Sequence, residues 1–170
     1  MKEIDPKKLN INPMEMISDE WMLISAGKQG HYNTMTASWG HLGSLWGHGS
    51  GKPTAICYIR PQRYTKQFVD EEPIYTLTFF PKEYKKALAY LGTHSGRDED
   101  KVSKVGLTPV FGDGSVYFKE ASLVLVCKKL YVGKIKEENF LDPEIVKEHY
   151  PKKDFHTFYI GEIIRAYVAE

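Results

Sequence analysis

Four polar segments, separated by apolar runs, carry the side chains of this chain that could do chemistry. They are residues 33–39 (NTMTASW), 60–65 (RPQRYT), 95–101 (SGRDEDK) and 156–163 (HTFYIGEI). Short hydroxyls, backbone amides and arginine forks are the groups that hold phosphate oxygens in proteins. The first three segments therefore predict an anion-binding site to which distant parts of the chain contribute.

The 33–39 segment predicts an extended stretch with two chemically different faces. Odd-numbered side chains point one way and even-numbered ones the other; the two sets are Asn33, Met35, Ala37 and Trp39, and Thr34, Thr36 and Ser38. The second set forms a row of short hydroxyls, which can donate hydrogen bonds to a phosphate or to the polar edge of a flat ring. The alternative is a β-branched strand whose hydroxyls face water.

Arg60, Arg63 and Thr65 lie where a predicted strand ends and a helix begins. Unpaired N–H groups and the helix dipole favour an anion at such a junction. A guanidinium group adds a rigid fork that matches phosphate oxygens. Alternatively, both arginines are surface residues that pair with the acidic residues 70–72.

The 95–101 segment has the composition of a second loop facing an anion. Ser95 can cap a helix, Gly96 allows close approach of the backbone, and Arg97 and Lys101 supply charge. The alternative is a solvated helix, because acidic residues stand three and four positions before Lys101 and Lys104.

Other binding motifs are absent. The glycine-rich stretch around Lys52 is not a phosphate-binding loop, because Trp46 replaces the first glycine and Pro53 follows the lysine. It also lacks the last glycine of a dinucleotide-binding fingerprint. His41 and His48 lack the spacing of metal ligands, so no metal site is predicted.

The elements that must position these segments are mostly strands. Runs rich in β-branched and aromatic residues predict strands at 21–25, 54–59, 74–79, 122–132 and 155–168. Residues 27–30 and the FGDGS run at 111–115 predict turns, the second a tight hairpin. The regular alternation of strands and helices typical of a parallel sheet is missing, so a mainly β barrel with a few inserted helices is expected.

Four helices are predicted. The clearest runs from Pro81 to Gly92, with Tyr84, Ala87, Leu88 and Leu91 on one face. Pro61 can open a second, which would turn Tyr64, Phe68 and Val69 inward. Residues 98–104 and 142–148 predict two shorter ones.

Length and charge limit the class of protein. The 170 residues fit one domain spanning 1–170, and 23 Lys and Arg against 22 Asp and Glu argue against nucleic-acid binding. Cys57 and Cys127 lie in apolar runs and predict buried thiols. Residues 1–17 are charged and hold two prolines, and no run approaches a membrane span, so a cytoplasmic protein is expected without membrane contact.

Taken together and in this order, the four segments resemble the flavin reductase-like family of FMN-binding split β-barrels, from about Trp21 to Val168. The resemblance implies an antiparallel Greek-key barrel and FMN as cofactor. It assigns FMN binding to the following residues: Asn33, Thr34, Met35, Thr36, Ala37, Ser38, Trp39, Arg60, Arg63, Thr65, Ser95, Gly96, Arg97 and Lys101.

The resemblance also implies an activity. NADH or NADPH would deliver hydride to flavin, and the reduced flavin would pass electrons onward, with an electron-acceptor protein as a further partner. His156 would lie near the flavin face and bind nicotinamide or supply a proton, although a histidine held by backbone partners fits the sequence equally well. A homodimer with FMN near the subunit interface is expected.

Two other functions fit the same segments. One is a non-enzymatic FMN-binding electron carrier or redox sensor, which needs the binding residues but no turnover. The other is a pyridoxamine phosphate oxidase-like enzyme, which would share the barrel and the cofactor.

Overall fold

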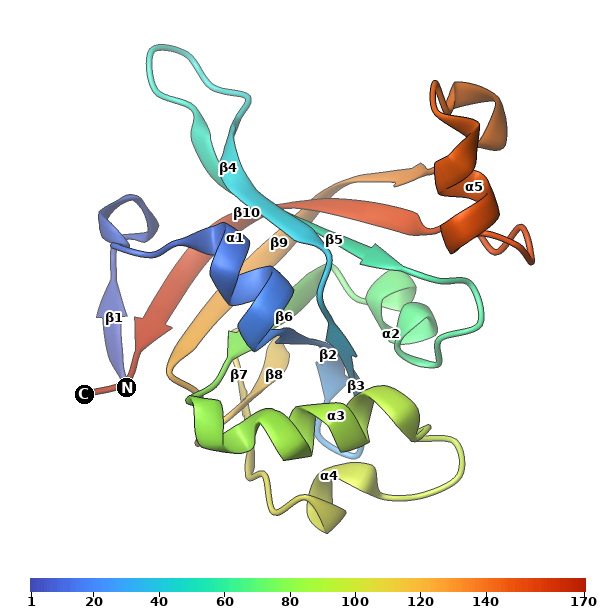
Figure 1. The fold of residues 1–170 in the computed structure, drawn as a ribbon. Helices are drawn as coiled ribbons and strands as arrows, with labels where there is room; N and C mark the ends of the chain where they lie inside the picture. Colours follow the sequence, from blue (N-terminus) through green and yellow to red (C-terminus); the bar gives the residue numbers. More distant parts are fainter.

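A computed structural model describes all 170 residues and shows the predicted antiparallel sheet (Figure 1). Its strands run in the order β3-β2-β6-β9-β10-β5-β4, and β1 adds to β10. The strands are β1 (Lys2–Ile4), β2 (Met22–Lys28), β3 (His31–Ala37), β4 (Gly40–Leu45), β5 (Lys52–Ile59), β6 (Ile74–Phe79), β9 (Leu123–Lys134) and β10 (Thr157–Val168). All pairings are antiparallel.

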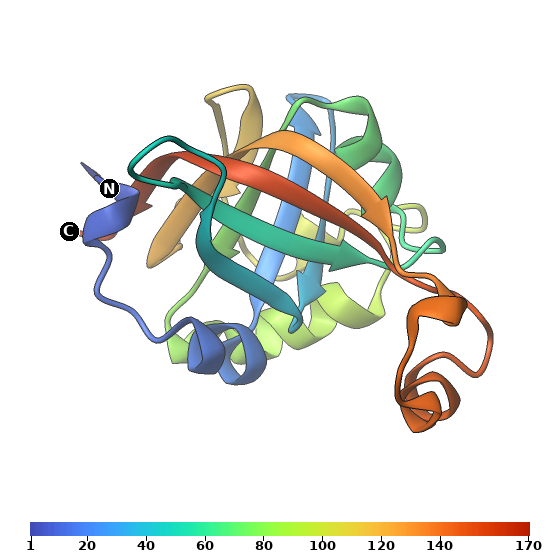
Figure 2. The same cartoon turned by 90° about the horizontal axis from the view of Figure 1, so that it is seen from above.

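The sheet curls into a split barrel. β3 and β4 stand at opposite ends of the strand order, yet only Ser38 and Trp39 separate them in the chain. The sheet must therefore bend until its two edges meet at this point (Figure 2). No ladder pairs β3 with β4, so the barrel stays split there. The predicted mainly β, split-barrel fold class is confirmed.

A separate hairpin joins β7 (Pro109–Gly112) to β8 (Ser115–Phe118). Its two turn residues, Asp113 and Gly114, have φ of 52° and 78°. Both angles are positive, as a two-residue turn that matches strand twist requires. The predicted Asp-Gly hairpin is confirmed.

The helices lie outside the barrel. They are α1 (Pro13–Glu15), which continues as a π-helical turn (Met16–Glu20), then α2 (Thr65–Glu71), α3 (Lys85–Thr93), α4 (Lys101–Lys104) and α5 (Pro143–His149). Single 3₁₀ turns occur at Pro6–Lys8, Lys82–Tyr84 and Glu137–Asn139. α5 lies on an excursion between β9 and β10 that projects beyond the sheet (Figure 2).

Two of the helix predictions were wrong about where the helix begins. α2 starts at Thr65 rather than at Pro61, because the Arg63 N–H donates to the Arg60 carbonyl and closes a turn first. α4 covers only Lys101–Lys104, because Asp100 accepts a hydrogen bond from the Ser103 N–H and caps it. In α3, Leu88 and Leu91 are buried as the periodicity predicts.

The apolar side chains form two clusters on opposite faces of the sheet. Met22 and Ile24 of β2 point into the barrel, whereas Leu23 between them packs under α3 with Leu88. This alternation follows from the two-residue period of a strand. The two cysteines are free and buried, and burial raises the pKa of Cys57 to about 12.

The sequence did not predict two of the strands, β1 and β4. β1 is too short and polar to show a pattern, and β4 contains two glycines and carries mostly exposed residues. The loop from Trp46 to Gly51 that follows β4 holds the glycine-rich stretch and projects from the barrel (Figure 1). No helix is both long and apolar enough to cross a membrane.

Candidate functional site

β3 and the bend that follows it form one wall of a groove made of adjoining pockets. The first, here called the Trp39 pocket, has a volume of about 230 Å³. It is lined by Met35, Thr36, Ala37, Ser38, Trp39, Tyr58, Arg60, Arg63 and His156. The second, here called the cationic pocket, has a volume of about 280 Å³ and shares Met35, Arg60 and Arg63 with the first.

The cationic pocket gathers residues from three of the predicted segments. β3 contributes Asn33 and Met35, the β5–α2 junction Arg60, Gln62, Arg63, Tyr64 and Thr65, and the end of α3 with the following loop Thr93, His94, Ser95, Gly96, Arg97 and Lys101. Residues more than 60 positions apart thus meet in one hollow. The sequence could name these segments but not their distance from one another.

Three of the cations in this pocket have no acidic partner. Arg63 donates to the Gly92 carbonyl at 2.7 Å, and Lys101 donates to the carbonyls of Leu91 and His94 at 2.8 and 2.9 Å. The Arg97 guanidinium lies over the Tyr64 ring, 4.6 Å from its centroid. No carboxylate comes within 4.0 Å of any of the three cations.

The electrostatics of the pocket favour an anion. Burial, and then the positive charge of Arg63, lower the pKa of Lys101 to about 8. Burial, and then Arg60, lower the pKa of Arg63. Desolvated cations that repel one another are stabilised when an anion enters. The expected salt bridges of Lys101 on a solvated helix are not formed, since its side chain is buried and bonds to carbonyls.

Arg60, unlike Arg63, has a carboxylate partner. Its guanidinium pairs with Asp154 at 2.7 Å, donates to the His149 carbonyl at 2.9 Å and lies over the Tyr150 ring. These contacts neutralise Arg60 and tie it to the α5 excursion. Arg63 is therefore the arginine of the pair whose charge is free to meet an anion.

Asn33 and Gly96 set the width of the cationic pocket. The Asn33 side-chain amide donates to the Thr65 hydroxyl at 2.9 Å, which links β3 to α2. A Cβ atom added at Gly96 would lie 2.2 Å from the Asn33 side-chain oxygen, so a larger residue at position 96 would have to displace the Asn33 amide. A methyl group at position 96 would therefore disturb the contact between β3 and the 95–97 loop at one side of the pocket.

The predicted row of hydroxyls does not face the groove as one set, because Thr34 and Thr36 bond within the protein while Ser38 lines the Trp39 pocket. Thr34 is fully buried, and its hydroxyl lies 2.7 Å from that of Ser25 and donates to the Ile24 carbonyl. The Thr36 hydroxyl donates to the Leu88 carbonyl of α3. The interpretation of a single ligand-facing row was therefore wrong for the hydroxyls of Thr34 and Thr36, which bond to Ser25, Ile24 and Leu88. β3 is an edge strand, so it still presents unpaired backbone groups.

His156 immediately precedes β10 and is almost fully buried. Its Nδ1 shares a 2.8 Å hydrogen bond with the Tyr150 hydroxyl, and its ring centroid lies 5.0 Å from that of Trp39. Burial, and then the positive charge of Arg60, lower the pKa of His156 to about 4. The imidazole is therefore neutral at neutral pH, with Nε2 as its remaining polar atom.

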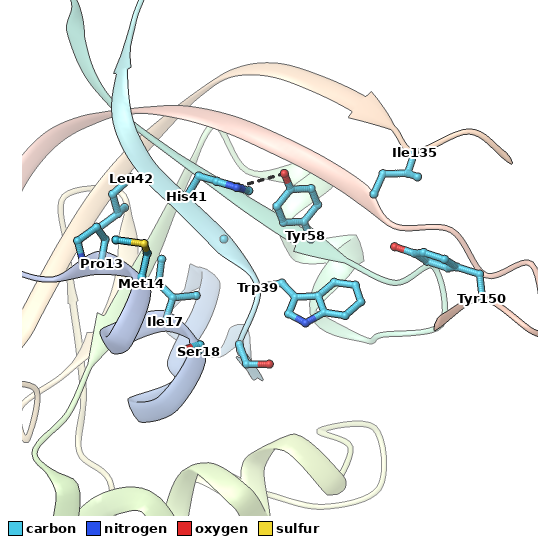
Figure 3. Close-up of a pocket in the computed structure, with 12 residues that line it drawn as sticks. Pro13, Met14, Ile17, Ser18, Trp39, His41, Leu42, Tyr58, Ile135 and Tyr150 are labelled. Carbon is cyan, nitrogen blue, oxygen red and sulfur yellow. Dashed lines mark hydrogen bonds between the residues drawn. The ribbon is translucent and has the colours of Figure 1, made fainter. Parts of the chain in front are cut away.

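A larger apolar pocket adjoins the Trp39 pocket and shares Ser38, Trp39 and Tyr58 with it (Figure 3). Its volume is about 570 Å³. Pro13, Met14 and Ile17 close one side of it, and Tyr150 and Ile135 lie on the other (Figure 3). The His41 ring nitrogen Nδ1 lies 3.3 Å from the Tyr58 hydroxyl in its wall.

Sequence reasoning missed Tyr58 and Tyr150. Tyr58 belongs to an apolar run, but it also stands two positions before Arg60, a spacing that places the two side chains on the same face of an extended chain. That spacing was an available signal. Tyr150 follows α5 and reaches the groove only because the excursion folds back over Arg60, which no local pattern shows.

The chain is thus a split antiparallel barrel with a groove that is cationic in one part and aromatic in the next. The model of the flavin reductase-like domain matches residues 14–170, and the chain belongs to this family. No match was found among curated proteins.

Solved structures with the same fold come from several organisms. An FMN-binding domain of a flavin reductase-like enzyme from Shewanella baltica OS155 has a TM-score of 0.67 at 17% identity, covering 98% of this chain and 76% of that one. Flavoredoxin from Methanosarcina acetivorans gives 0.64 at 22%, covering 89% and 69%. An NADH:FAD oxidoreductase from Streptomyces globisporus gives 0.64 at 16%, covering 88% and 75%.

Proposed function

We propose that the chain binds FMN along β3, with the phosphate in the cationic pocket and the ring system in the Trp39 pocket. The observation that carries this proposal is the cluster of Arg63, Arg97 and Lys101 without a carboxylate partner. A phosphate supplies the missing negative charge, and guanidinium groups match its oxygens. The two pockets share Met35 and Arg63, so one ligand can occupy both.

The remaining predicted residues have distinct roles in this proposal. Ser95, Gly96 and Thr65 bring hydroxyl and backbone groups to the phosphate side, and Asn33 holds them in place. On the ring side, the groove is lined by Met35, Thr36, Ala37, Ser38 and Trp39. Thr34 supports the strand from the core side.

The proposed activity is flavin reduction by a nicotinamide nucleotide. When bound, the flavin accepts hydride from NADH or NADPH and passes electrons onward, which the protein's own side chains cannot do. His156 borders the ring pocket as a neutral imidazole whose Nδ1 is held by Tyr150. Its Nε2 is the polar group that would bind the donor or hold a proton there.

We also propose a cytoplasmic homodimer that passes electrons to an acceptor protein. The support for a dimer is the apolar pocket beside the groove, with Met14, Trp39 and Trp46 exposed to 77%, 40% and 47%. Exposed large apolar groups are typical of an interface, and Met14 and Trp39 line the same apolar pocket. If each site needs both chains, mixing subunits that carry different groove mutations will restore part of the lost activity.

The first experiment is an absorbance spectrum of the purified protein, with FMN added if it is colourless, followed by anaerobic NADH and then NADPH. Flavin bands that bleach rapidly are expected. Bands that persist with both donors would instead favour the electron carrier or sensor. Formation of pyridoxal phosphate from pyridoxamine phosphate would favour the oxidase-like alternative, and no flavin binding would contradict the proposal altogether.

Replacing Gly96 with alanine is expected to weaken FMN binding, because the new Cβ would displace the Asn33 amide and break its hydrogen bond to Thr65. Overpacking of this kind costs about 1–3 kcal/mol, or roughly five- to 150-fold in affinity if the cost falls on the bound state. Isothermal titration with FMN measures the change. Gly112→Ala is the matched control, since a Cβ there meets nothing within 4 Å. Equal affinity in both variants would contradict the role given to Gly96.

A further inference from the structure

The α5 excursion brings one tyrosine, Tyr150, back to the groove and holds its ring in place. The ring stacks on Phe155 with the centroids 4.8 Å apart, and the Arg60 guanidinium lies over it at 5.1 Å. The Tyr150 backbone N–H donates to the Val146 carbonyl at the end of α5. Tyr150 is only 2% exposed, and its hydroxyl points back toward Trp39 (Figure 3). The position of this hydroxyl is therefore fixed by the fold.

The Tyr150 hydroxyl decides which nitrogen of His156 carries the ring proton. Its one hydrogen-bond partner in the protein is Nδ1 of His156, at 2.8 Å. Burial raises the pKa of Tyr150, so the hydroxyl keeps its proton at neutral pH. If Nδ1 carried the ring proton, it would donate to the tyrosine oxygen and leave the buried hydroxyl hydrogen without an acceptor, which is costly. If the hydroxyl donates to Nδ1 instead, both groups are satisfied, and the imidazole proton lies on Nε2.

Nε2 of His156 faces the groove. It makes no hydrogen bond within the protein, and it is not among the buried polar atoms that lack a partner. It therefore reaches the surface of the Trp39 pocket, which His156 lines. An N–H group that opens into a pocket without a protein acceptor is available to a ligand.

The charges around His156 agree with this arrangement. Arg60 and Arg63 are positive, and Asp154 is paired with Arg60 at 2.7 Å. Because the arginines disfavour a second positive charge, the imidazole carries one proton rather than two. An imidazolium would also turn an N–H of Nδ1 toward the Tyr150 hydroxyl and displace the hydrogen bond that the hydroxyl donates.

We propose that Tyr150 is a positioning residue that fixes His156 as a hydrogen-bond donor, so that its Nε2–H binds a carbonyl oxygen of the ring system in the Trp39 pocket. This inference rests on the proposed function and specifies it. In this form Nε2 can donate a hydrogen bond or a proton but cannot accept one. Flavin rings and the nicotinamide carboxamide both carry carbonyl oxygens, and the experiments below distinguish them.

The first test is ¹⁵N NMR of the flavin-free protein labelled at histidine, with His156 assigned from the spectrum of His156→Ala. The protonated and unprotonated nitrogens of a neutral imidazole have well-separated shifts. At pH 7, Nε2 is expected to carry the proton, and the Nδ1 resonance should move in Tyr150→Phe because its hydrogen bond is lost. A proton on Nδ1 in the wild type, or an unmoved Nδ1 resonance in the variant, would overturn the inference.

The second test measures the effect of Tyr150→Phe on ligands, after circular dichroism has shown that the variant is folded. Either the KM for NADH at saturating FMN or the Kd for FMN should rise about tenfold, with a smaller loss of kcat than in His156→Ala. A higher KM alone identifies the nicotinamide carboxamide, and a higher Kd for FMN identifies a flavin carbonyl; both results support the inference. Tyr131→Phe is the control, because Tyr131 is exposed and lines neither pocket of the proposed FMN site.

The two tests separate this inference from the proposed function. If both constants are unchanged in Tyr150→Phe, the positioning role is overturned while FMN binding stands. If the wild type binds no flavin, the proposed function fails, and the NMR spectrum of the flavin-free protein still decides which nitrogen of His156 carries the proton.

Discussion

Replacing Lys101 with methionine is expected to raise the Kd for FMN about 100-fold. Lys101 is 4% exposed and its ammonium has no carboxylate partner, so a bound phosphate would be its main counter-charge. Methionine keeps the length of the side chain and removes the charge. Isothermal titration measures the loss, and circular dichroism checks that the variant is folded.

The matched control is Lys104→Met, which removes an exposed lysine from the same short helix. Its effect on FMN binding should stay below about threefold, because an exposed charge is screened by water and salt. Similar losses in both variants would show that general positive charge, rather than the buried ammonium, attracts the ligand.

The same lysine predicts a pH dependence of binding. Its pKa in the flavin-free protein is lowered to about 8, and a phosphate beside it would raise that value again, so binding takes up a proton above about pH 8. The Kd for FMN should therefore rise up to about tenfold per pH unit above 8 until the pKa of the complex is reached. Titrations between pH 7 and 10 test this, and Lys101→Met should remove most of the slope.

FMN affinity should fall above pH 8, whereas the contribution of Lys101 to folding stability should rise with pH in the flavin-free protein. The folded pKa of Lys101, about 8, lies below the ordinary value of 10.5, so the unfolded chain holds more protons between these values. The contribution of Lys101 to the free energy of unfolding therefore rises with pH in this range. Urea unfolding of wild type and Lys101→Met at pH 7.5 and 10 separates this contribution from those of other groups.

Replacing His156 with alanine is expected to lower the rate of NADH oxidation about 100-fold at saturating flavin, the usual size of the effect when a proton-transfer group is lost. FMN binding should change little, because His156 borders the Trp39 pocket and not the cationic one. Stopped-flow reduction of the bound flavin measures the rate directly. His48→Ala, in an exposed loop, is the control.

The pH profile of this reaction gives a second check on His156. Because its pKa is lowered to about 4, the imidazole is neutral from pH 5.5 upward and contributes no inflection between pH 5.5 and 8. An inflection near the ordinary histidine pKa that disappears in His156→Ala would contradict the buried, neutral imidazole. An unchanged rate in the variant would remove His156 from the reaction.

The strands could be predicted because burial imposes a two-residue period that local sequence records. β6 lies where the apolar run predicts it, and the Asp113-Gly114 turn follows from the backbone angles that such a pair adopts. Helix starts were less accurate, because a proline such as Pro61 can open a turn as readily as a helix. Local sequence does not show which of the two forms.

The sequence could predict which segments contribute to the site, but not which of their side chains face the groove. Whether the hydroxyls of Thr34 and Thr36 face a ligand or the core depends on which side of β3 the helix α3 covers, and that contact spans about 50 residues of chain. For the same reason, the sequence could not decide that Arg60 is neutralised by Asp154 while Arg63 is not.

The most direct test of the account compares FMN with riboflavin, which differ only by the phosphate, in isothermal titrations of the flavin-free protein at pH 7. Since the uncompensated cations Arg63, Arg97 and Lys101 are proposed to hold that phosphate, FMN should bind at least about 100-fold more tightly than riboflavin, and Lys101→Met should remove most of the difference. Equal affinities for FMN and riboflavin would contradict the proposed phosphate site and the orientation of the ligand along β3.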